Sequence, residues 1–153
     1  MALALSTKLV NDMLTTGSLK SIMEAAGGGN GFKIAIFGTS RPAAADTASG
    51  GAPLVTITAA ANAPCVFEAT ATDGVILKAV AQDWGGTIAS TGTAVWFRVY
   101  RFNDDPTLAS TTLPRFDGSC SSGASSDMVM GSLTLTAAAP FIITDASFTL
   151  PKG

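Results

Sequence analysis

Residues 93–102 form the longest run of β-branched and aromatic residues in the chain, Thr-Ala-Val-Trp-Phe-Arg-Val-Tyr-Arg-Phe. These residue types suit the pleated, half-buried surface of a β-sheet. Because side chains alternate along a strand, Phe97 and Val99 share one face, and Trp96 and Tyr100 share the other. With large apolar groups on both faces, the run is predicted to be an interior strand that is covered above and below.

The rest of the chain after residue 31 alternates between short apolar segments and turn signals. A loop is expected over 38–53, and turns are expected at Asp73-Gly74 and at 84–87, where glycines follow a tryptophan. Many short strands at regular spacing predict a mainly β fold, an antiparallel β-sandwich. The other segments expected as strands are 32–37, 54–58, 65–68, 75–78, 113–120, 128–130, 133–135 and 140–151.

The first 26 residues have helical rather than strand periodicity. Ser6 and Ser18 are suitable N-caps for two short helices, so a helical arm or hairpin is predicted over 1–26. The glycine-rich segment 27–31 then acts as a joint, and 32–153 forms the β-sandwich domain. The arm either folds back to complete the core of its own domain or packs in a groove of a neighbouring subunit. Its apolar face carries Leu5, Leu9, Met13, Leu19 and Ile22.

Charged residues make up only 13% of the chain, against roughly 25% in ordinary soluble domains. Since the cores of protein–protein interfaces are depleted in charge, this composition favours a protein that is largely covered by neighbours. The net charge of −2 comes without a basic patch, so neither nucleic acid nor an anionic membrane is an expected partner. No run of about 18 apolar residues is present, and the opening 1–5 lacks the features of a secretory signal. We therefore expect synthesis in a cytoplasm.

The sequence lacks the residues that common active sites need. It contains no histidine, which removes the usual general base and the usual metal ligand. Cys65 and Cys120 are not spaced as a zinc site and are expected to be free thiols, with a late disulfide as the alternative. The acids Asp104, Asp105, Asp117 and Asp127 are expected in loops, and they match no calcium-loop pattern. We therefore expect no enzymatic activity, cofactor or metal.

Trp84 is the aromatic residue with the strongest case for an exposed contact, because it lies beside glycines in the predicted turn. An exposed tryptophan there serves either a sugar or another protein chain. A carbohydrate- or receptor-binding module is thus one alternative function.

The N-terminal segment 5–20, Leu-Ser-Thr-Lys-Leu-Val-Asn-Asp-Met-Leu-Thr-Thr-Gly-Ser-Leu-Lys, resembles the opening of a family of small virion structural proteins of tailed bacteriophages. The strand-like segment 32–37, the loop 38–43, the segment 93–99 and the end at 148–151 are also similar to that family. The longer Gly/Ala/Ser-rich insertions and the two cysteines depart from its pattern, so they leave the local contacts open.

The resemblance implies a non-enzymatic protein of the virion, made in the cytoplasm of the bacterial host. On this basis we expect a capsid decoration or stabilising protein that docks in multiple copies, with a neck, collar or tail-associated protein as the alternative. The expected partners are further copies of the chain and other virion proteins, such as the major capsid or neck proteins. The expected interface residues are Leu5, Leu9, Met13, Leu19, Ile22 and Trp84.

Overall fold

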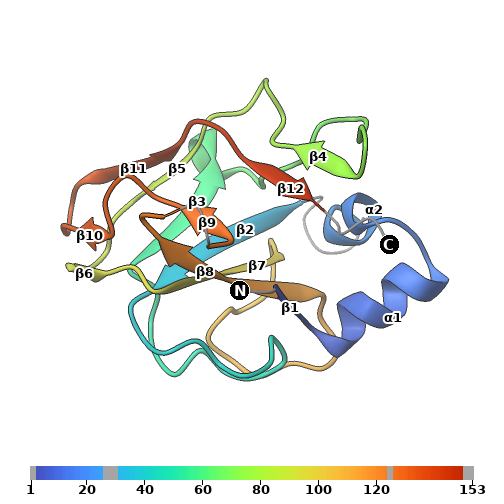
Figure 1. Ribbon diagram of the computed structural model, residues 1–153, viewed down its shortest axis with the longest axis horizontal. Coiled ribbons are helices and arrows are strands. Elements are labelled where there is room, and N and C mark those ends of the chain that lie inside the picture. Colours follow the sequence, from blue (N-terminus) through green and yellow to red (C-terminus); the bar gives the residue numbers. More distant parts are fainter. Residues whose placement is uncertain (1–2, 26–30, 124–125, 150–153) are drawn as a thin grey trace.

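The computed structural model describes residues 3–25, 31–123 and 126–149 and is mainly β (Figure 1). Its helices are α1 (Thr7–Thr15), α2 (Leu19–Met23) and the 3₁₀ turn η1 (Ala60–Asn62). Its strands are β1 (Ala4–Leu5), β2 (Phe32–Phe37), β3 (Val55–Ala59), β4 (Val75–Leu77), β5 (Trp84–Thr87), β6 (Gly92–Thr93), β7 (Trp96–Arg101), β8 (Arg115–Ser121), β9 (Met128–Val129), β10 (Thr134–Leu135), β11 (Pro140–Ile143) and β12 (Ser147–Thr149). None of the described helices is long and apolar enough to cross a membrane.

The strands form one large sheet and two small ones. The large sheet has eight strands in the order β1-β8-β7-β2-β3-β5-β11, with β9 paired to β8 as well, and the small sheets are β10-β6 and β12-β4. Every pair is antiparallel except β8-β9. The large sheet curls, so that β5 and β11 face β2 and β7 across the core, and β12 of a small sheet lies on the same side as β11 (Figure 1). The predicted antiparallel β-sandwich with N-terminal helices is confirmed.

Strand β7 lies between β2 and β8 and is covered on both faces. Phe97 and Val99 belong to the main apolar core, while Trp96 and Tyr100 form a second cluster with residues of β2. The rings of Trp96 and Phe37 stack with their centroids 4.3 Å apart in that second cluster. The prediction of an interior strand is therefore confirmed, although regular pairing with β2 begins at Trp96.

The N-terminal helices pack on the β domain of the same chain. Ser6 caps α1 by accepting a hydrogen bond from the Leu9 N–H at 3.2 Å, and Ser18 caps α2 in the same way. Leu9 and Met23 are completely buried in the main core, and β1 pairs with β8. Of the two arrangements left open by the sequence, the arm therefore adopts the one that completes its own core. Buried residues of 1–26 and of 32–153 belong to one core cluster. Residues 27–30 of the predicted joint 27–31 and the last residue of the predicted arm lie outside the described residues.

The prediction of a turn at residues 84–87 was wrong. These residues form strand β5, which lies between β3 and β11. The two glycines are there because neighbouring backbones come close. A Cβ atom on Gly86 would lie 2.2 Å from the Thr56 carbonyl oxygen, and one on Gly85 would lie 2.7 Å from the Phe141 carbonyl oxygen. Glycine in a strand marks such close approaches as well as turns.

Two buried arginines hold the loops that cover the other face of the sheet. Arg98 makes a bidentate ion pair with Asp117, with both N–O distances 2.8 Å, and donates to the carbonyls of Thr47 and Pro106. Arg115 pairs with Asp104 at 2.6 Å and donates to the carbonyls of Leu108 and Asp105. The loops 38–53 and 102–114 are thereby fixed to β7 and β8, on one side of the sheet in Figure 1.

Candidate interaction groove

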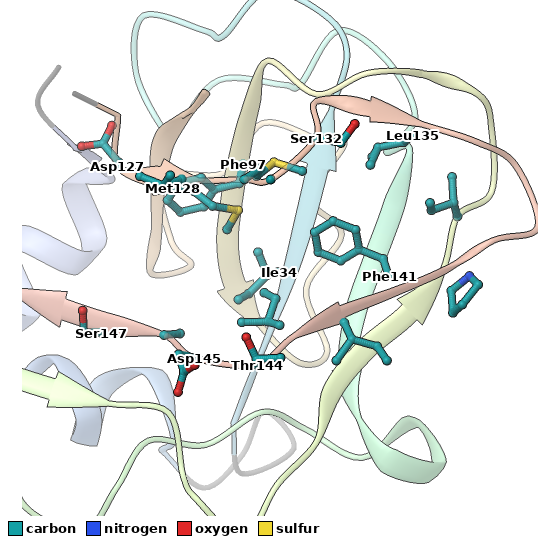
Figure 2. A pocket seen from close by; sticks show the side chains of 18 of the residues that line it. Ile34, Phe97, Asp127, Met128, Ser132, Leu135, Phe141, Thr144, Asp145 and Ser147 are labelled. Atoms are coloured by element: carbon teal, nitrogen blue, oxygen red, sulfur yellow. The ribbon is translucent and has the colours of Figure 1, made fainter. Parts of the chain in front are cut away.

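A groove of about 850 Å³ opens between the main sheet and the segment 127–149 (Figure 2). Its floor is Ile34 of β2 and Phe97 of β7. One wall is β11, which contributes Phe141 and Ile143, and the other wall runs from β9 to β10. Small-molecule and peptide sites are concave and mostly apolar, so this groove is the leading candidate for a functional site in the described part of the chain.

The groove exists because the two halves of 127–149 pair with different strands. The first half forms β9 on β8 and β10 on β6. The chain then reverses near Ala138, which has a φ of +66°, and the second half forms β11 on β5 and β12 on β4. Within the described residues, no strand pairing joins one half to the other, so a gap remains between them over the apolar floor.

The lining is apolar except for a few hydroxyl side chains and two carboxylates, Asp127 and Asp145. Asp127 has a local structural role, because it accepts hydrogen bonds from the Ser119 N–H at 2.9 Å and from its hydroxyl at 2.8 Å. Asp145 is exposed at the rim. Among the described residues that line the groove there is neither a nucleophile–base pair nor a basic side chain.

One wall of the groove is a free sheet edge. The Ala139 carbonyl accepts from the Ile88 N–H at 3.0 Å, and hydrogen-bonding residues alternate along an antiparallel pair. Phe141 and Ile143 therefore direct their backbone groups to β5, whereas the N–H and C=O of Ile142 point away from it. No described strand pairs with this edge, and the Ile142 side chain is 66% exposed.

Comparison of the chain with protein-family models, with curated proteins and with solved structures finds no match.

Four of the six predicted interface residues lie in the core of their own chain instead of on one surface. Leu9, Leu19, Ile22 and Trp84 are at most 9% exposed. Only Leu5, at 37%, and the half-buried Met13 retain accessible surface. The helical periodicity correctly marked an apolar face, but that face is covered by the β domain. Val10 and Leu14, on the outer side of α1, are exposed as well.

Trp84 is completely buried, which corrects the prediction of an exposed aromatic residue. Its indole N–H donates to Gln82 Oε1 at 2.8 Å, and its ring meets the Phe32 ring edge-on with the centroids 5.3 Å apart. Since β5 is an internal strand, both sides of the ring are covered. Trp84 therefore cannot stack on a sugar in this fold.

The cysteines and the loop acids are accounted for by local structure. Cys65 and Cys120 are buried free thiols, as predicted, and burial raises the pKa of each to about 12. Asp104 and Asp117, by contrast, form ion pairs with the arginines described above, and Asp117 lies in β8 instead of in a loop. Among the described residues, no group of three or more His, Cys, Asp or Glu side chains is placed to hold a metal ion.

The groove was not predicted from the sequence, and its signal there is weak. The sequence of 127–149 predicts ordinary short strands. The gap arises only because the two halves of this segment pair with different strands of the sandwich. Pro140 is the one local clue, because proline in a strand indicates a sheet edge.

Proposed function

We propose that this chain is a non-enzymatic structural component of a tailed-phage virion, which docks in multiple copies on the capsid as a decoration or stabilising protein. The observation that carries the proposal is the groove beside the edge of β11, with which no described strand pairs. The low charge of the chain and its resemblance to small phage virion proteins point in the same direction. A collar or tail position is the alternative within the same class.

Several further apolar side chains are available for lateral contacts between copies. Leu14, Val80 and Leu108 are 79%, 88% and 61% exposed, respectively. Scattered exposed apolar residues are common in monomers. These residues therefore support contacts between copies only in combination with the low charge content of the chain. Burial of apolar area stabilises such contacts by roughly 25 cal/mol per Å², before the cost of ordering the partners.

A carbohydrate-binding module is disfavoured relative to a structural role, because Trp84, the residue expected to stack on sugar, is buried. The partners we propose are other copies of the chain and the major capsid or neck proteins. Synthesis takes place in the bacterial host cytoplasm, and the final location is the virion.

The proposal is tested by quantitative mass spectrometry of gradient-purified virions from the phage that encodes the chain. We expect a fixed number of copies per particle, in a symmetric ratio to the major capsid protein. A phage carrying a stop codon early in the gene should give particles that lack the chain and lose DNA at lower temperature. Finding the chain only in the lysate, and never on washed particles, would contradict the proposal.

A further inference from the structure

The first turn of α1 is the place where the N-terminal arm, residues 3–25 of the described chain, meets the two outer loops, 38–53 and 102–114 (Figure 1). Asp46 of the first loop accepts hydrogen bonds from the Thr7 N–H at 3.1 Å and from the Thr7 hydroxyl at 2.6 Å. The Asp46 carbonyl accepts from the Ser110 N–H of the second loop at 2.8 Å. One residue therefore connects the arm with both loops.

Ser6 provides a second connection between the arm and the loop 102–114. Its buried hydroxyl accepts from the Leu9 N–H at 3.2 Å, which caps α1, and from the Arg115 N–H at 2.9 Å. The same hydroxyl lies 3.4 Å from the Leu113 carbonyl, to which it donates. A hydroxyl has one donor and two acceptor sites, so all of its hydrogen-bonding capacity is used here. The guanidinium of Arg115 in turn holds the loop through Asp104 and the Leu108 carbonyl.

The carboxylate at the start of α1 comes from a loop instead of from the helix itself. A negative charge at a helix N-terminus is stabilising, but the first turn of α1 contains no acidic residue. Asp46 supplies that charge from the loop 38–53. The start of the helix therefore depends on the position of the loop, and by thermodynamic linkage the position of the loop depends equally on the helix.

We infer that the first turn of α1, together with Asp46 and Arg115, is a clasp that couples the docking of the arm to the order of both outer loops. A partner that holds the loops stabilises the docked arm, and a partner that draws the arm away loosens the loops. Because Leu9 is completely buried, the released arm is a minor state of the isolated chain. The inference does not rest on the proposed function, since the coupling belongs to the isolated chain.

The test is amide hydrogen exchange of the whole chain followed by NMR, which detects minor open states. The loops are followed at the N–H of Ser110 and at the N–H of Ser49, which donates to the Thr107 carbonyl at 3.3 Å. Leu9→Ala weakens the docking of the arm from its core side. Ile76→Ala, the matched control, removes a buried side chain from β4, in a small sheet away from the outer loops (Figure 1).

We expect Leu9→Ala to speed exchange at Ser49 and Ser110 by about tenfold, whereas Ile76→Ala should leave both rates unchanged. Asp46→Ala, which removes the clasp carboxylate, should speed exchange at Ser110 and also at Val10, whose N–H donates to the Ser6 carbonyl at 3.1 Å. When Asp46→Ala is already present, adding Leu9→Ala should change the rate at Ser49 by less than about threefold, because the connection to the arm is cut.

Thermal unfolding checks that each variant is folded, and Leu9→Val replaces Leu9→Ala if the alanine variant does not fold. Equal rates at Ser49 and Ser110 in Leu9→Ala and Ile76→Ala would overturn the inference. So would an effect of Leu9→Ala that is as large with Asp46→Ala as without it. Absence of the chain from virions would reject the proposed function, and it would leave the result for the clasp unchanged.

Discussion

At the scale of single residues, the buried ion pairs decide how the loops are held. Arg98 and Asp117 are both completely buried, and the guanidinium also satisfies two loop carbonyls. Burying two charges costs several kcal/mol, so such a pair adds little net stability, but loss of one member leaves the other unpaired. Arg98 is therefore retained for the arrangement of loops 38–53 and 102–114 more than for stability as such.

Arg98→Met should lower the free energy of unfolding by about 3–5 kcal/mol, because it leaves the Asp117 carboxylate buried without its partner. The double variant Arg98→Met with Asp117→Leu should be less destabilised than the single variant. Urea unfolding followed by circular dichroism provides the measurement. Lys8→Ala, which removes the partly exposed pair with Asp12, is the control and should cost at most about 1 kcal/mol. If Arg98→Met and Lys8→Ala lowered the free energy of unfolding equally, the buried Arg98–Asp117 pair would not have the role described.

The two thiols should be unreactive in the folded protein. Cys65 and Cys120 are buried, and their pKa of about 12 keeps them protonated at neutral pH, whereas the thiolate is the reactive form. We expect reaction with a disulfide reagent at pH 8 to be slow and limited by opening of the structure. In strong denaturant, two thiols per chain should react at once. Rapid reaction of either cysteine in the native protein would contradict its placement.

At the scale of elements, the N-terminal helices are part of the core instead of a detachable arm. Leu9 of α1 is fully buried, whereas Leu14 of the same helix is 79% exposed. Leu9→Ala should lower the free energy of unfolding by about 2–5 kcal/mol, the usual cost of emptying a buried leucine site. Leu14→Ala, the matched control, should change it by at most about 0.5 kcal/mol. If both variants are equally stable, the helix does not pack as described.

Strand β5 depends on glycine where its neighbours approach closely. Gly86→Ala should destabilise the fold by about 1–3 kcal/mol, because the new Cβ would meet the Thr56 carbonyl at 2.2 Å and the strands would have to shift. At Gly131, where a Cβ meets nothing within 4 Å, the same change should be neutral within about 0.5 kcal/mol. Thermal unfolding of the two variants gives the comparison, and a stable Gly86→Ala would show that β5 is placed differently.

Elements with a strong local pattern were predictable from the sequence, and those defined by distant partners were not. The alternation in 32–37 and the caps Ser6 and Ser18 gave the correct strand and helices. Residues 84–87 were assigned to a turn because glycines suit turns as well as close strand approaches, and only the neighbours β3 and β11 distinguish the two. The prediction that Trp84 is exposed was wrong for the same reason, because its burial depends on these neighbouring strands.

At the scale of the whole molecule, the fold is a sandwich whose second layer has a gap. The helices and both layers contribute to one main core, and the loops on the other face of the large sheet are fixed by Arg98 and Arg115. Beside β11 the described chain leaves a strand edge unpaired, whereas the floor residues Ile34 and Phe97 are at most 3% exposed. The low charge content of the sequence predicted contacts with other proteins, and the helical arm was the predicted contact surface. The free edge of β11 was not predicted, because pairing between distant strands is not visible in a local sequence pattern.

The most direct measurement of the central claim is a cryo-EM reconstruction of the intact virion. The account predicts that this β-sandwich fits density repeated on the capsid, or at the neck. A reconstruction in which all density is explained by other proteins, with the chain absent from the particle by mass spectrometry, would contradict the account.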